Sequence, residues 1–243
     1  MKLQKLLSLV RQAVEKYQMI KEGDKIAVGV SGGKDSLTLL YALKELSRFY
    51  PKKFTVCAVS VDLGFSNTDF SRVQAFCDKL NVPLSIVHTQ IGQIVMEGRK
   101  ESNPCSLCAK MRRGSLNTAL VEKGIRKIAL GHHYDDAVET LLMNLLFEGR
   151  IGCFQPVTFL DRTGVTQIRP LLYCHEEEIQ RIANREKLPI VHNTCPIDGH
   201  SRRQEVKELL ASMEKTYPDL KQKIFGAMQR YPLYGWRDGG AER

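Results

Sequence analysis

Short apolar runs alternate with amphipathic stretches over the N-terminal half of the chain. The amphipathic stretches repeat apolar residues every three or four positions, which is typical of helices that bury one face. The runs between them are almost continuously apolar, as expected for strands of a parallel sheet covered on both sides. The pattern therefore predicts a doubly wound α/β fold with a parallel sheet. Strands are expected at residues 25–30, 55–61, 84–88 and 127–130, and helices at 1–20, 35–48, 68–81 and 106–123.

The C-terminal part of the chain carries a weaker alternation. It predicts one short strand at 166–169 and helices at 176–187, 201–216 and 219–230. We therefore expect four parts, the last of which is a tail rich in glycine and charge that is predicted to be mobile. They are an N-terminal helix (1–24), an α/β domain (25–175), a helical region (176–231) and the tail (232–243).

The turn after the first strand, residues 31–36, has the composition of a phosphate-binding loop. It reads Ser-Gly-Gly-Lys-Asp-Ser and opens a helix, where unpaired amides and the helix dipole attract an anion. Two glycines let the anion approach the main chain, and Lys34 adds a full charge. The common nucleoside-triphosphate loop is excluded because the glycine spacing is one residue short and Asp35 follows the lysine. The alternative is an ordinary glycine turn before a helix.

Two further polar segments follow predicted strands, and ligands of such sheets bind beyond the carboxyl ends of the strands. Residues 131–136 read Gly-His-His-Tyr-Asp-Asp and begin a helix. Asp135 and Asp136 suit Mg²⁺ on phosphate oxygens, although acidic residues at a helix N-terminus are also ordinary caps. Asp62 ends the second strand and could hold magnesium or substrate; the alternative is a loop or cap aspartate.

Seven cysteines occur in a chain without an export signal, so metal ligation or redox chemistry is expected for some of them rather than disulfides. Cys105 and Cys108 are spaced to share a metal or cluster. A redox pair and a structural zinc site, with His192 or His200 as a further ligand, remain alternatives. Cys195 is the candidate third thiol. Its rivals are Cys153 and Cys174, whereas Cys57 and Cys77 are predicted to be buried as small hydrophobic residues.

The formal net charge of +9 favours a polyanionic partner, and nucleic acid is the main candidate. The candidate contacts are Arg112, Arg113, Arg202 and Arg203. The alternative is a solvated basic surface. No apolar stretch is long enough to span a bilayer, so we expect no membrane partner and a cytoplasmic location. The amphipathic N-terminal helix packs either on its own core or on a second copy in a homodimer.

The loop at 31–36 resembles that of the N-type ATP pyrophosphatases. Residues 131–136, with Glu139 and Thr140 downstream, resemble the second signature of the thiolating members. Together with Cys105, Cys108 and Cys195, these segments are similar to the tRNA 2-thiocytidine synthetase family. The resemblance covers roughly residues 1–215, and the C-terminal region is shorter than in larger members.

This resemblance implies an adenine nucleotide alpha hydrolase-like fold and an ATP-dependent tRNA thiolase. Such an enzyme adenylates O2 of a cytidine, expected at position 32 of the anticodon loop, and replaces that oxygen with sulfur. A [4Fe-4S] cluster would sit on Cys105, Cys108 and Cys195, and a cysteine desulfurase or sulfide would supply the sulfur. Catalytic roles would fall to Lys34, Asp35, Asp62, Asp135, Cys105 and Cys108. ATP and Mg²⁺ would bind Ser31, Gly32, Gly33, Lys34, Asp35, Ser36, Asp62, Gly131, His132 and Asp136.

Three alternatives to cytidine thiolation differ in their cysteine requirements. The tRNA lysidine synthetases share the loop but need no cysteine cluster, so the Cys105/Cys108 pair argues against them. The 2-thiouridine synthetases are closer, but related members carry extra cysteine pairs near both termini, whereas no cysteine here precedes Cys57 or follows Cys195. A non-catalytic, zinc-stabilised RNA-binding module is the third alternative.

Overall fold

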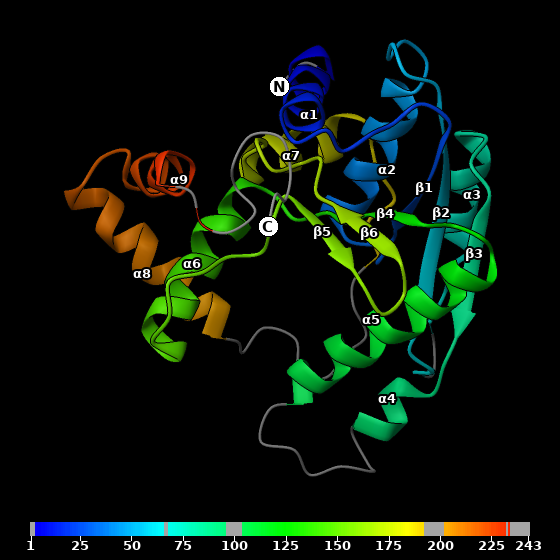
Figure 1. Cartoon of the computed structure of the whole chain (residues 1–243). Helices are drawn as coiled ribbons and strands as arrows, with labels where there is room; N and C mark the ends of the chain where they lie inside the picture. The colour runs from blue at the N-terminus through cyan, green and yellow to red at the C-terminus, as the bar shows by residue number, and fades with distance from the viewer. Residues whose placement is uncertain (1–2, 66–67, 96–103, 192–201, 232, 234–243) are drawn as a thin grey trace.

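The computed structural model describes residues 3–65, 68–95, 104–191, 202–231 and 233, without the side chains of 104–106. In this part, six strands form one sheet in the order β3-β2-β1-β4-β6-β5 (Figure 1). All neighbours pair in parallel except β5 and β6, which form an antiparallel hairpin at one edge. The strands are β1 (Asp24–Gly29), β2 (Phe54–Asp62), β3 (Leu84–His88), β4 (Lys127–Ala129), β5 (Val157–Leu160) and β6 (Val165–Ile168).

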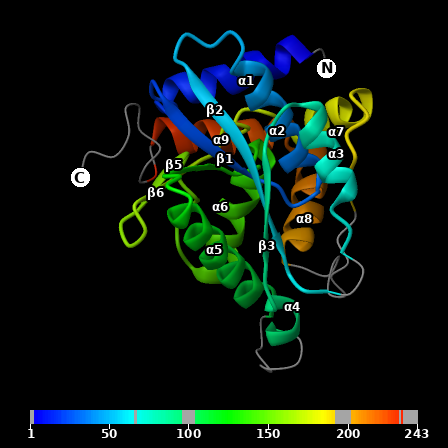
Figure 2. The ribbon, with the colours of Figure 1, turned by 90° about the vertical axis from the view of Figure 1, so that its right-hand side faces the viewer.

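Helices cover both faces of the sheet, but unequally. One helix, α5, packs with Ala27, Cys57 and Ile128 on one face. The larger core on the other face collects apolar side chains from α1, α2, α3, α6 and α7, and Figure 2 shows α2, α3 and α7 opposite α5. The helices are α1 (Leu3–Lys16), α2 (Lys34–Leu46), α3 (Ser71–Lys79), α4 (Ile91–Gln93), α5 (Pro104–Glu122), α6 (Tyr134–Glu148), α7 (Glu176–Arg185), α8 (Arg202–Thr216) and α9 (Leu220–Arg230).

The predicted doubly wound α/β fold is confirmed, and the five predicted strands and the long helices all form within a few residues of their expected limits. Two elements were not predicted. The three-residue helix α4 is too short to leave a periodic pattern, and β5 has only four residues with Phe159 largely exposed on the sheet edge. The sheet is therefore parallel with one antiparallel edge strand. The predicted mobile tail, 232–243, lies outside the described residues apart from Leu233.

The strand order changes direction between β1 and β4, which lie side by side although they are far apart in the chain. Open α/β sheets bind ligands at such a point, beyond the carboxyl ends of the strands. The loops after β1 and β4 both begin there, so the fold brings two of the three candidate segments together. Among the described residues, no helix combines the length and the apolar character needed to cross a lipid bilayer.

Candidate active site

The loop between β1 and α2 exposes main-chain amides at a helix N-terminus. Gly33 caps α2 in extended conformation without any side-chain capping bond, so the first amides of the helix are left for a ligand. Gly32 has a φ of +83°, a conformation that favours glycine. The Ser31 amide donates to Ser36 Oγ at 3.1 Å, and this hydroxyl donates to the Gly33 carbonyl at 2.9 Å. The geometry is that of an anion-binding loop whose conformation is fixed by hydrogen bonds to the Ser36 side chain.

The segment after β4 packs directly against the start of α2. A Cβ atom at Gly131 would lie 3.2 Å from the backbone of Asp35 and of Ser36, so only glycine fits without a shift. His133 caps α6, because its Nδ1 accepts from the Asp136 amide while Asp136 Oδ2 accepts from the His133 amide. The backbone contact at Gly131 therefore places the turn that carries Asp135 and Asp136 directly against the β1–α2 loop.

Asp35 of the loop and the two acids at the start of α6, Asp135 and Asp136, differ in their partners. Asp35 Oδ1 is buried and accepts no hydrogen bond from any described residue, and burial raises the pKa of this carboxyl. Asp135 accepts from the Lys221 ammonium at 3.0 Å and from the Glu176 amide at 2.8 Å. Asp136 is bound by the His133 amide and by Arg203 at 3.2 Å. Of the three, Asp35 is the carboxylate with an oxygen to spare for a cation.

An ion-pair network joins this corner of the sheet to the C-terminal helices. We use "ion-pair network" for Lys34, Asp35, Asp135, Asp136, Glu139, Glu176, Arg203, Lys207 and Lys221.

Glu176, the first residue of α7, accepts from Lys34 at 3.0 Å and from Lys207 of α8 at 2.8 Å. Burial acts to raise the pKa of Glu176, but the bonds from Lys207 and Lys34 outweigh it and lower this pKa to about 2. Arg203 donates to Glu139 at 2.9 Å, and the Glu139 side chain is 1% exposed. Every charge of the network thus has an opposite charge beside it.

Asp62 points away from this corner. Its carboxylate accepts from the Gly64 amide at 2.9 Å and contacts His88 Nδ1 at 3.0 Å. Val61 and Leu63 on either side line the cavity described next, but Asp62 does not. The loop-capping role, the alternative considered for Asp62 from the sequence, is the role its carboxylate has in the structure.

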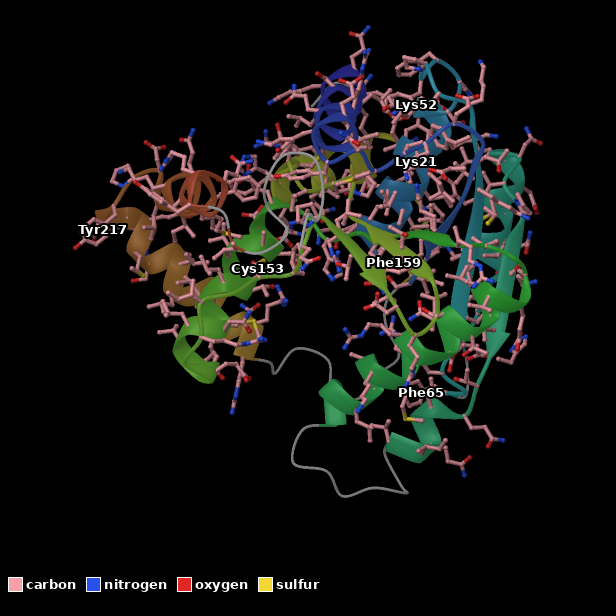
Figure 3. The ribbon with its side chains drawn as sticks, in the orientation of Figure 1. Lys21, Lys52, Phe65, Cys153, Phe159 and Tyr217 are labelled. Carbon is pink, nitrogen blue, oxygen red and sulfur yellow. The ribbon has the colours of Figure 1, made fainter. Side chains whose placement is uncertain are left out.

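A cavity of about 760 Å³ opens at the carboxyl ends of the strands, and its two sides differ in chemistry. The β1–α2 loop lies between them, as the strand order requires. On the β2 side the wall is apolar, and Phe65, labelled in Figure 3, belongs to it. The apolar wall consists of Val59, Val61, Leu63, Phe65, Phe70 and Val73; the basic wall on the β4–β6 side consists of Arg112, Arg113, His132, Gln167 and Arg169.

The four arginines expected to contact nucleic acid separate into two pairs. Arg112 and Arg113 of α5 line the cavity, and neither forms an ion pair with a described residue. Arg202 of α8 stacks over the Phe147 ring, with its guanidinium carbon 4.9 Å from the ring centroid. Arg203 belongs to the ion-pair network. The cavity therefore gathers only the α5 pair.

The cysteine pair lies at the edge of the same cavity. Positions 105 and 108 are about one turn apart in the backbone of α5, Cys108 is half-buried, and the next residue, Ala109, lines the cavity. Cys195, His192 and His200 lie outside the described residues, as does the side chain of Cys105. Among the side chains described, no three potential ligands gather into a metal site.

The rival thiols have other surroundings. Cys174 is fully buried in the core, and burial raises the pKa of its thiol. Cys153, labelled in Figure 3, packs beside α6, where its Sγ donates to the Ala137 carbonyl at 3.4 Å. Burial raises the pKa of Cys153 to about 12. In the absence of a metal, both thiols are therefore held in the protonated form.

Several site residues were missed from the sequence. Arg169 and Gln167 of the basic wall follow the same rule as the residues that were found, since they lie at the carboxyl end of β6. Because β6 has only four residues, its carboxyl end is not marked clearly in the sequence. Glu176, Lys207 and Lys221 carry no local signal, because their partners are far away in the sequence.

Comparisons with known proteins agree with this geometry. Residues 4–212 match a family described as "PP-loop domain". The chain is 39% identical to the tRNA-cytidine(32) 2-sulfurtransferase of Pelobacter propionicus, over 92% of this chain and 84% of that protein. It is 37% identical to that of Geobacter sulfurreducens, over 92% and 88%. Among solved structures, it is similar to the U34-tRNA thiolase NcsA of Methanococcus maripaludis with its [4Fe-4S] cluster. That match has a TM-score of 0.76 and 27% identity, and covers 94% of this chain and 78% of that one.

Proposed function

We propose that this chain, which belongs to the PP-loop domain family and within it to the tRNA-cytidine(32) 2-sulfurtransferases, converts a cytidine of the tRNA anticodon loop to 2-thiocytidine. The chain is thus a sulfurtransferase enzyme. The observation that carries the proposal is the shared cavity: the anion-binding loop after β1 and the helix that bears Cys108 line one space. Activation by ATP and delivery of sulfur can then occur at the same base.

The reaction has two steps on the base. O2 of cytidine attacks the α-phosphorus of ATP, the bond from that phosphorus to pyrophosphate breaks, and pyrophosphate leaves with the electron pair. Sulfur at the oxidation level of sulfide then bonds to C2, and AMP departs with the former O2. Residues 31–33 line the cavity at the positive end of α2, and the Lys34 ammonium lies at the same helix end, so this loop would hold the departing pyrophosphate. Anticodon-loop bases are only partly stacked, which lowers the cost of turning one into the cavity.

Magnesium would be held by Asp35 in this scheme. The unpartnered Oδ1 of Asp35 fits a divalent cation, which prefers carboxylate oxygens, and Asp136 lies next to it at the start of α6. Asp135 is less suited because both of its oxygens already accept bonds. When bound, the ion would neutralise charge on the triphosphate as pyrophosphate leaves.

The iron–sulfur cluster would be held by Cys105, Cys108 and Cys195. The pair in α5 fits this role, because the half-buried Cys108 lies next to Ala109 of the cavity lining, whereas neither Cys153 nor Cys174 lines the cavity. When bound, the cluster would supply the sulfur that replaces O2 at C2. NcsA, similar over most of this chain, contains such a cluster. The sulfur donor and the homodimer remain predictions.

Nucleoside mass spectrometry of tRNA tests the proposal directly. Cells lacking this chain are expected to lose 2-thiocytidine, and the wild-type gene should restore it. Unchanged 2-thiocytidine in the deletion strain would contradict the proposal. Loss of 2-thiouridine instead would favour the second candidate, a uridine thiolase, which the similarity to NcsA supports.

Metal analysis separates the remaining alternative. Protein purified without oxygen is expected to contain iron and acid-labile sulfide. One tightly bound zinc per chain without sulfide would favour a zinc-stabilised RNA-binding module.

A further inference from the structure

Arg169 is a buried cation whose charge no described carboxylate balances. It is 5% exposed, lines the basic wall of the cavity, and forms no ion pair with a described residue. Burial lowers the pKa of Arg169 to about 10, so the guanidinium stays charged at neutral pH. Placing an unpaired charge in the interior is costly, and proteins retain one where a ligand supplies the opposite charge.

Neutral groups fix the position of this guanidinium. Nη1 donates to the Gln155 carbonyl and, at 3.0 Å, to Thr158 Oγ1, while Nη2 lies 3.5 Å from Gln167 Oε1. The guanidinium carbon lies 5.0 Å from the centroid of the Phe154 ring. Nε has no hydrogen-bond partner among the described residues. The β5–β6 hairpin therefore holds the guanidinium in a fixed position with two N–H donors unused, one on Nε and one on Nη2, and adjacent donors of this kind suit a phosphate or carboxylate.

His132 beside it adds no competing charge. Its Nδ1 is also buried without a described partner, and burial together with Arg169 lowers the pKa of His132 to about 4. The imidazole is therefore neutral at physiological pH. The anion that enters this part of the cavity meets one deeply buried cation, with Arg112 and Arg113 farther out on α5.

The order of the walls indicates which anion this is. Across the sheet, the apolar wall on β2 is followed by the β1–α2 loop and then by the basic wall on β4 and β6. A planar base suits the apolar wall and the loop suits pyrophosphate. The α-phosphoryl group is bonded to both parts of ATP, so it lies beside the loop, where the basic wall is the neighbouring source of positive charge. We propose that Arg169 binds the α-phosphoryl group of the nucleotide, in ATP and in the adenylated base. This inference rests on the proposed adenylation but not on the identity of the base.

Nucleotide binding to the full chain without tRNA tests this role. Isothermal titration would compare AMP with adenosine, which lacks the phosphate, for the wild type and Arg169→Met. We expect AMP affinity to fall about tenfold or more while adenosine affinity stays unchanged. A purely structural role would weaken both ligands together or neither, and either result would overturn the proposal. The matched control is Arg126→Met, which removes another guanidinium that donates to this hairpin, at the Thr163 carbonyl, but lies outside the cavity lining.

Two further measurements keep the test decisive if Arg169→Met does not fold. Arg169→Gln keeps an amide that can donate to the Gln155 carbonyl, and the same loss of AMP affinity is expected. In the wild type, the Nε–H resonance of Arg169 should shift on addition of AMP but not of adenosine. An unmoved resonance would refute the contact. Because no tRNA is present, a chain that thiolates uridine would still give the expected result.

Discussion

The ion-pair network and the basic wall of the cavity differ in whether their charges are balanced within the chain. Around the start of α6 and α7, the acids and bases of the ion-pair network neutralise one another, and Glu139 is almost inaccessible beneath Arg203 and Lys207. On the basic wall, Arg112, Arg113 and Arg169 have no described carboxylate beside them. Both sides are rich in arginine or lysine, so composition alone does not distinguish them.

The difference separates charges that hold the fold from charges that await a ligand. Ion pairs within the chain stabilise the packing of α8 and α9 against α6 and α7. Unbalanced charges contribute little to the stability of the free protein and gain a partner only on binding. A basic cluster in a sequence thus has one of two roles: it stabilises the fold where acidic side chains of the same chain pair with it, and it is available to a ligand where none do.

Lys34→Ala gives the largest expected effect and tests whether the network contributes to chemistry as well as to stability. Pyrophosphate release that depends on tRNA should fall by about 100-fold, because a charge that stabilises the leaving group is lost. Stability should change little, since Glu176 retains Lys207. Lys44→Ala, a lysine near the other end of α2, is the control. Normal turnover by Lys34→Ala would remove Lys34 from the mechanism.

Arg203→Met and Arg169→Met compare the two sides directly. Arg203→Met should lower the free energy of unfolding by about 2 kcal/mol, because it leaves Glu139 buried beside only the more distant Lys207. Arg169→Met should cost less, about 1 kcal/mol, because it removes hydrogen bonds to neutral groups but leaves no charge without its partner. Urea unfolding followed by circular dichroism measures both. A larger cost for Arg169→Met would contradict the division into two sides.

Glu176→Gln tests the network through pH. The pKa of Glu176 is lowered from 4.5 to about 2 in the folded chain. A lowered pKa contributes stability above the unfolded value and loses it as pH falls through the folded value. The wild type should therefore exceed Glu176→Gln by about 1 kcal/mol at pH 6, and the difference should shrink as pH falls below about 4.5. Urea unfolding at several pH values measures it; a difference independent of pH would be the contrary outcome.

Arg113→Ala gives the smallest effect and sharpens the distinction between α5 and α8. A cation that contacts an RNA phosphate releases a counterion, so its loss should weaken tRNA binding a few-fold and reduce the salt slope by about one unit. Arg202→Ala should leave the slope unchanged, because this guanidinium rests on Phe147. Filter binding between low and moderate salt measures both. Equal slopes for the two variants would show that Arg113 does not face RNA.

Most of the fold could be predicted because the strands of a parallel sheet leave a local signature. Residues 25–30 and 55–61 are nearly all apolar, and each is followed by a helical repeat. Strand β5 escaped prediction because it is a four-residue edge strand: three of its residues are apolar, but so short a run is not distinguished from a loop. An edge strand is recognised from its partner, which a local pattern does not reveal.

In the candidate site, too, the residues in continuous motifs could be predicted and those with distant partners could not. Glycine and acid motifs at strand ends were visible, because the loop after β1 and the segment after β4 are each continuous in sequence. The partners of Lys34 and Asp135 were not, since Glu176 and Lys221 come from helices far along the chain. The roles of Asp62 and Arg203 also depended on neighbours, His88 and Glu139, that only the folded chain brings within reach.

The contact at Gly131 makes two loops a single mechanical unit. A Cβ atom added at Gly131 would lie only 3.2 Å from the backbone of Asp35, so the turn after β4 packs tightly against the first residues of α2. Neither turn can shift without carrying the other. A displacement of the loop after β1 would therefore press on Gly131, the residue before His132 of the basic wall, through main-chain atoms.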